Sequence, residues 1–192
     1  ITSGIYPDND THIEVCRYGK GQGAMSLLAT ILVDKHDLIP RPLSWLSNII
    51  LHPIVFLRSL NPFGVAEKST YLLVMQTLGN YMRFDYKRRW WRLGKRSMNS
   101  NCNTDQKVPA YIPVANEYTK RMAEKMNGDP AASIPEILLN TSTTAHILGG
   151  CIMADSPEKG VTDYKGHIYG YDNLFVADGS IVPSNLGVNP SL

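Results

Sequence analysis

A long apolar stretch between residues 39 and 64 constrains the fold of this chain more than any other feature of its sequence, because Pro42 and Pro53 interrupt it. Pro42 and Pro53 each suit the first turn of a helix, and neither is tolerated well in a helix interior. A membrane-spanning helix needs about 20 consecutive apolar residues. The stretch therefore predicts two short helices rather than one spanning helix.

The apolar side chains of these two expected helices allow two interpretations. Trp45, Leu46, Ile49 and Ile50 fall on one face of the first helix, and a second apolar group follows at residues 55–60. Such faces commonly pack on a protein core. Alternatively, they could form an interfacial flap that contacts a membrane or covers a lipid pocket. The sequence leaves both interpretations open.

Composition and charge exclude several classes of protein. Of 192 residues, 43% are hydrophobic and 19% are charged, which argues against a disordered or collagen-like chain. A formal net charge of +2 argues against a polycation for nucleic acid, so no nucleic-acid partner is expected. Cys16, Cys102 and Cys151 lie far apart without a CxxC pair, so neither a zinc knuckle nor a disulfide framework is predicted, and no metal site is expected.

The two ends of the sequence suggest an internal piece of a longer protein. The chain begins at Ile1 without the pattern of a signal peptide, and it stops just after Pro190, which is well placed to start a helix. The cellular location therefore stays open: a secreted, a membrane-associated and a cytoplasmic protein are all compatible with this sequence.

Alternating side chains predict strands in the first half of the chain. Residues 11–17 alternate as in a strand with two unlike faces, and residues 71–77 have the composition of a strand. A turn at Gly79-Asn80 predicts that residues 81–91 return beside 71–77 as a hairpin. Residues 114–126 predict a helix that ends at Asn127-Gly128.

Positive charge is concentrated between residues 83 and 96, where seven lysines and arginines face a single aspartate. Trp90 and Trp91 lie among them. Such a segment suits a solvated edge strand whose charges prevent aggregation. Binding to anionic lipid headgroups or nucleic acid is the less favoured alternative.

The last third of the chain contains the residues best suited to chemistry. His146 precedes the pair Gly149-Gly150, and two adjacent glycines permit a ligand to approach the backbone closely. Residues 174–177 predict a short buried strand, which places Asp178-Gly179 at its carboxyl end, where ligands bind in open α/β sheets.

Two motifs in this part, HILGGC at 146–151 and NLFVADGSIVPSNLGVNPSL at 173–192, closely resemble the C-terminal signature of the glucose-methanol-choline (GMC) oxidoreductases. Members of this family are flavoproteins that oxidise alcohols, and the chain is most similar to the cholesterol oxidase branch. The specific resemblance covers residues 142–192. The match is looser over residues 1–140, and Ile147 stands where many members have proline.

The resemblance implies roles for individual residues. His146 would hydrogen-bond the substrate hydroxyl and help to take its proton, and Asn189 would contact the hydroxyl and the flavin ring. Glu14 would move a proton within the steroid ring during isomerisation, although an exposed strand residue without a role is the alternative for Glu14. The remaining implied positions would line the FAD cofactor: Gly149, Gly150, Asp178, Gly179, Gly187, Val188 and Pro190.

These expectations define a fold and a function. We expect an α+β or α/β fold in which residues 1–140 form a substrate-binding sheet flanked by helices. Residues 141–192 would return to a Rossmann-like FAD-binding domain whose GxGxxG fingerprint is absent from this sequence. The expected activity is oxidation of a sterol or another hydrophobic alcohol, and peripheral membrane contact is a further possibility. A non-catalytic lipid-binding module is the alternative.

Overall fold

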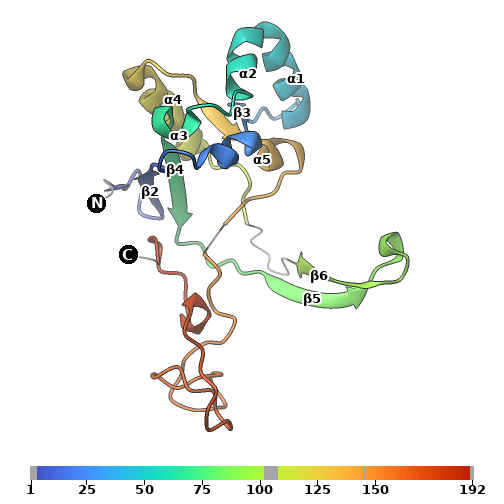
Figure 1. Ribbon diagram of the computed structural model, residues 1–192, viewed down its shortest axis with the longest axis vertical. Coiled ribbons are helices and arrows are strands. Elements are labelled where there is room, and N and C mark those ends of the chain that lie inside the picture. The colour runs from blue at the N-terminus through green and yellow to red at the C-terminus, as the bar shows by residue number, and fades with distance from the viewer. Residues whose placement is uncertain (1–3, 102–107, 145, 191–192) are drawn as a thin grey trace.

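The computed structural model describes residues 4–101, 108–144 and 146–190. Helices and small antiparallel sheets alternate along the first 140 residues, and mostly irregular chain follows (Figure 1). The strands are β1 (Gly4–Ile5), β2 (Thr11–Cys16), β3 (Ala29–Ile31), β4 (Tyr71–Gln76), β5 (Arg83–Arg88), β6 (Arg96–Asn101) and β7 (Ala131–Ser133). The helices are α1 (Arg41–Leu51), α2 (Pro53–Ser59), α3 (Val65–Lys68), α4 (Pro113–Met126) and α5 (Ile134–Leu138), with 3-10 turns at Gly23–Leu28, Trp90–Arg92 and Gly179–Ile181.

A three-stranded antiparallel sheet in the order β1-β2-β4 forms the centre of the fold. β2 confirms the strand predicted at residues 11–17, and β4 pairs with it in a register that places Ile13 opposite Val74. Ile13 is 1% exposed, and Met75 on β4 is also buried. Residues 11–14 are buried on both faces of β2, so Glu14 is not an exposed strand residue.

The predicted hairpin between residues 71–77 and 81–91 is wrong. β5 pairs with β6 instead, and this second hairpin extends away from the rest of the molecule (Figure 1). Its turn lies at residues 89–95, where Leu93 and Gly94 both adopt left-handed backbone angles and Gly94 N–H donates to Arg89 O. The pairing of β4 with β2 buries apolar side chains that the charged β5 strand does not offer, which accounts for the choice of partner.

The two helices predicted from the proline-broken stretch are confirmed as α1 and α2. Pro42 and Pro53 lie in their first turns, where the missing N–H is not needed. The predicted helix at 114–126 is confirmed as α4, which ends at Asn127 in the left-handed conformation. None of the helices in the described ranges is long and apolar enough to cross a lipid bilayer.

Helix α1 directs polar rather than apolar side chains toward the body of the protein. Arg41 is 7% exposed and bonds Glu136 of α5 at 2.6 Å, and Trp45 Nε1 donates to Thr30 Oγ1 of β3 at 2.9 Å. The opposite side of α1 exposes Leu46 and Ile50. Of the four apolar residues assigned to one face, Trp45 and Ile49 are therefore half-buried, whereas Leu46 and Ile50 are exposed.

The short run at residues 174–177 does not form the predicted buried strand. Phe175 makes one isolated antiparallel bridge with His167, and both Leu174 and Phe175 are about half exposed. The named strands of the described residues pair only antiparallel, and no doubly wound parallel sheet is present among them. The fold of the described chain is α+β, with the central sheet and helices in its first 140 residues.

Candidate active site

Two segments that are far apart in the sequence meet around an open cavity of about 390 Å³. His146, Ile147 and Leu148 line one side, and Asp178, Gly179, Ser180 and Pro190 complete the wall. Four residues that the sequence analysis selected, His146, Asp178, Gly179 and Pro190, thus surround a common space. An imidazole and a carboxylate at the same cavity provide groups that can hold and move a proton.

Backbone hydrogen bonds hold the two sides of this cavity together. Cys151 N–H donates to Ser180 O, and Met153 N–H donates to Ile181 O, each at 2.9 Å. The segment that follows His146 is therefore attached to the turn that follows Asp178. This pairing explains how the two motifs come to form one site.

Asp178 caps the short helical turn at Gly179–Ile181. Its Oδ1 accepts a hydrogen bond from the backbone N–H of Ser180 at 2.8 Å. Two hydrogen bonds lower the pKa of the Asp178 carboxyl: the larger effect comes from the Ser180 side chain, and the smaller one comes from the Ser180 backbone N–H. Asp178 is therefore a carboxylate at neutral pH.

Glycines allow close packing of backbone at the cavity. A Cβ atom at Gly179 would lie 3.2 Å from Leu148 Cδ2, and one at Gly150 would lie 3.5 Å from the Cβ of Ser180. Gly149 has φ +78°, a backbone conformation that favours glycine. A flat ligand could approach this backbone more closely than it could approach a wall of larger side chains.

The segment after the cavity docks on the end of strand β4. Asn185 Nδ2 donates to Gln76 O at 2.7 Å, and its Oδ1 accepts from Gly187 N–H at 3.0 Å. Gly187 is buried, and a Cβ atom there would lie 2.4 Å from Cγ2 of Thr77. Thr11 on β2 is the partner of Gln76 in the sheet, so this contact joins the last segment to the central sheet.

Six residues selected from the sequence are not among those that line the cavity: Glu14, Gly149, Gly150, Gly187, Val188 and Asn189. Glu14 lies buried on β2, Asn189 is half-buried, and Val188 is 40% exposed. Glu14 instead has His12 as its neighbour, with 3.6 Å between His12 Nδ1 and Glu14 Oε1. Sequence reasoning missed His12, although residues i and i+2 of a strand share one face and the spacing could have revealed the pair.

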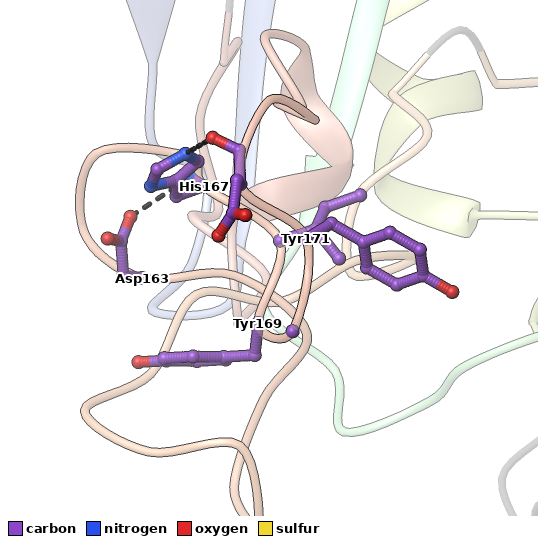
Figure 2. Close-up of a pocket in the computed structure, with 7 residues that line it drawn as sticks. Asp163, His167, Tyr169 and Tyr171 are labelled. Atoms are coloured by element: carbon purple, nitrogen blue, oxygen red, sulfur yellow. Dashed lines mark hydrogen bonds between the residues drawn. The ribbon is translucent and has the colours of Figure 1, made fainter.

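A second depression of about 320 Å³ surrounds Asp163, His167, Tyr169 and Tyr171 (Figure 2). Asp163 Oδ1 accepts from the backbone N–H groups of His167 and Lys165, and the bond from His167 is the main reason that the pKa of Asp163 is lowered. His167 Nε2 lies 2.9 Å from Asp172 O, and its ring stacks on Phe175. The Tyr171 ring points away from both groups (Figure 2). These contacts stabilise a loop and leave the first cavity as the better candidate.

Across residues 4–101, 108–144 and 146–190, no group of three or more histidine, cysteine, aspartate or glutamate side chains lies close enough together to hold a metal ion. The cavity combines a histidine, a carboxylate and closely approachable backbone. Histidine and carboxylate side chains are groups that can take part in acid–base chemistry.

Comparisons with known proteins identify the family. Residues 80–192 match the GMC oxidoreductase family, so the chain belongs to the GMC oxidoreductases. It is 44% identical over 193 residues to a cholesterol oxidase of Acinetobacter baumannii and 41% identical over 196 residues to one of Mycobacterium tuberculosis. Both alignments cover the whole of this chain. They cover 34% of the Acinetobacter protein and 33% of the Mycobacterium protein, so the chain spans about a third of the length of these relatives. It corresponds to a C-terminal fragment.

More distant relatives match only part of the chain. A long-chain-alcohol oxidase of Arabidopsis thaliana is 44% identical over 52 residues, which cover 27% of this chain and 7% of the relative. No solved structure matches the chain.

The docking of Gly187 on Thr77 predicts different effects for two glycine substitutions. Gly187→Ala should make amide hydrogen exchange of residues 183–190 at least about tenfold faster, which corresponds to about 1.4 kcal/mol of easier local opening. The matched control is Gly170→Ala, because Gly170 has φ +82° but no heavy atom within 4 Å of the position of its added Cβ. Equal exchange in segment 183–190 for the two variants would contradict the proposed close contact.

Proposed function

We propose that this chain is the C-terminal part of an FAD-dependent sterol oxidase or dehydrogenase that converts a 3β-hydroxyl to a ketone. The observation that carries the proposal is the meeting of His146 with the Asp178–Gly179 turn and Pro190 around one cavity. Identity of 44% to a cholesterol oxidase along the whole chain supports the sterol as substrate class. The long-chain-alcohol oxidases match only about a quarter of the chain, which makes them weaker guides to its substrate.

We propose that the cavity receives a part of FAD and not the whole cofactor. Its volume of about 390 Å³ suits a ring system or a short polar segment, and close glycine backbone at Gly149, Gly150 and Gly179 suits a flat or extended group. We propose that these residues, with Asp178, Gly187, Val188 and Pro190, would line the cofactor. The dinucleotide phosphates would be held by a Rossmann-like domain outside this sequence, to which residues 141–192 return, while residues 1–140 bind the substrate.

Oxidation of an alcohol requires removal of a proton from oxygen and a hydride from carbon. Bound FAD supplies the hydride acceptor. This chain then has to hold the hydroxyl and accept its proton. His146 is the imidazole at the cavity, and histidine is the side chain that most often transfers protons in enzymes; such assistance contributes about 10²–10⁴-fold to a rate. Asn189 would orient the hydroxyl, and Glu14 would move a proton when the ring double bond shifts.

Substitution of His146 tests this assignment in the full-length protein. His146→Ala should lower turnover with cholesterol by at least about tenfold while FAD stays bound, because proton transfer is lost and the binding surface is kept. The matched control is His36→Ala, since His36 is exposed and lies outside the cavity. Turnover and flavin content should be measured together, and unchanged turnover in His146→Ala would remove this role.

We also propose that the protein contacts membranes peripherally through α1 and α2. Leu43, Leu46, Ile50, Leu51, Ile54 and Leu57 expose half or more of their surface. Lone exposed apolar residues are ordinary, but a group of this size on two adjacent helices marks an interaction surface. The β5–β6 hairpin adds arginines and lysines together with Trp90, which is 84% exposed, and such a surface suits anionic headgroups.

Vesicle sedimentation of the full-length protein separates these contributions. The double variant Ile50→Glu with Ile54→Glu should weaken binding to phosphatidylcholine vesicles that contain phosphatidylserine by at least about tenfold. The reason is that charges replace apolar side chains that would enter the membrane interface. Lys125→Glu on the exposed side of α4 is the control and should change binding little. Binding that disappears in high salt, together with a full-length protein that contains no flavin, would favour the non-catalytic lipid-binding module. Equal binding of all variants would remove the α1–α2 surface.

A further inference from the structure

We propose that His12 is a positioning residue for Glu14: its Nδ1–H donates to Glu14 Oε1 and so orients the carboxylate for proton transfer. This inference rests on the proposed function, in which Glu14 moves a proton as the ring double bond shifts. Nothing in the sequence motifs or in the comparisons assigns a role to His12. Strand β2 carries both residues.

Strand geometry places His12 and Glu14 on the same face of the central sheet, because side chains alternate along a strand. His12 Nδ1 and Glu14 Oε1 are 3.6 Å apart, and the two side chains are only 8% and 7% exposed. A carboxylate removed from water in this way loses hydration, and a nearby donor is the natural compensation. The pair is therefore shielded from solvent and already close to hydrogen-bond distance.

Strand β1 and Tyr6, the residue that follows it, hold the His12 ring in place. The ring stacks on Tyr6 with 4.2 Å between centroids and 5° between planes. Gly4, the cross-strand partner of Glu14, leaves the space that the ring occupies, since a Cβ atom at Gly4 would lie 2.3 Å from His12 Nε2. Any larger residue at position 4 would displace the imidazole. The orientation of His12 is thus determined from two sides.

The hydrogen bonding of His12 is incomplete. Its Nδ1 is buried and has no hydrogen-bond partner within the described part of the chain. The carboxylate oxygen in ion-pair contact with His12 Nδ1 is Glu14 Oε1, 3.6 Å away, and we take it as the acceptor. A shift of a few tenths of an ångström would convert this contact into a charge-assisted hydrogen bond. Hydrogen bonds of catalytic groups are often long without substrate and tighten when substrate binds.

The step that Glu14 performs needs one oxygen free. In the isomerisation of a β,γ-unsaturated ketone, the C–H bond between the carbonyl and the double bond breaks, and the proton passes to the carboxylate. The electron pair of that bond moves into the conjugated enolate. The same proton then returns to the far carbon of the former double bond, so no oxidant or reductant is consumed. A bond from His12 to Oε1 would leave Oε2 as the oxygen that takes the proton.

Two amide variants separate a donor at Nδ1 from simple filling of space. The side-chain amide of asparagine lies near the position of histidine Nδ1, whereas that of glutamine lies near Nε2. In the full-length protein, His12→Asn should keep isomerisation of directly supplied cholest-5-en-3-one within about threefold of the wild type. His12→Gln and His12→Leu should lower kcat at least tenfold with KM changed less than threefold. Reduction of flavin by cholesterol should stay unchanged in all three.

Equal losses in the three variants would overturn the proposal, because they would indicate a packing role alone. No loss in any of the three would also overturn it.

A second measurement does not depend on activity. In full-length protein with ¹⁵N-labelled histidine, the Nδ1 resonance of His12 should report a protonated, hydrogen-bonded nitrogen and should move in Glu14→Gln. An unmoved resonance would overturn the pairing. If wild-type protein neither reduces flavin with cholesterol nor isomerises the ketone, the proposed function fails, while the resonance still decides whether the pair exists.

Discussion

The antiparallel pairing of β2 with β4 connects the strand that carries Glu14 to the segment that follows the cavity. Ile13 opposite Val74 and the burial of Met75 supply apolar contact at the centre of the sheet. One face of β2 carries His12 and Glu14, and the end of β4 receives the final segment through the bond from Asn185 to Gln76 O. Loss of this pairing would separate the carboxylate of β2 from the segment that contributes the cavity.

Helix α1 is attached to the rest of this GMC oxidoreductase chain by polar contacts, whereas the apolar side chains of α1 and α2 lie mostly on the surface. The fully buried apolar core of the chain is small, and α1 is attached to the body through Arg41 and Trp45 rather than through leucines. The apolar residues of α1 and α2 face outward instead. Polar side chains fix the position of a helix by directional hydrogen bonds. The outward apolar face of α1 is therefore not needed to attach the helix and can contact another surface.

Local sequence signals predicted the elements that depend on local chemistry. Pro42 and Pro53 marked helix starts, Asn127 marked a helix end, and alternation marked β2. Each of these signals acts over a few residues, which is why it can be read without tertiary information.

Pairing between distant segments was not predictable in the same way. The choice of β2 over β5 as the partner of β4 depends on burial across many intervening residues, and residues 174–177 meet no neighbouring strand in the described chain. His146 and the Asp178–Gly179 turn were selected from their motifs, but their meeting at a cavity required the structure. The environment of His12 depends on Tyr6 and Gly4 across the sheet, so sequence spacing could suggest only its nearness to Glu14.

The most direct test of the proposed function is an anaerobic titration of the full-length protein with cholesterol, followed through the visible absorption of its flavin. The account predicts that the oxidised flavin band is lost in proportion to the sterol added, because the alcohol carbon transfers its hydride to the bound cofactor. A flavin band that cholesterol leaves unchanged, but that another alcohol bleaches, would contradict the sterol as substrate. A protein purified without any flavin would contradict the oxidase itself.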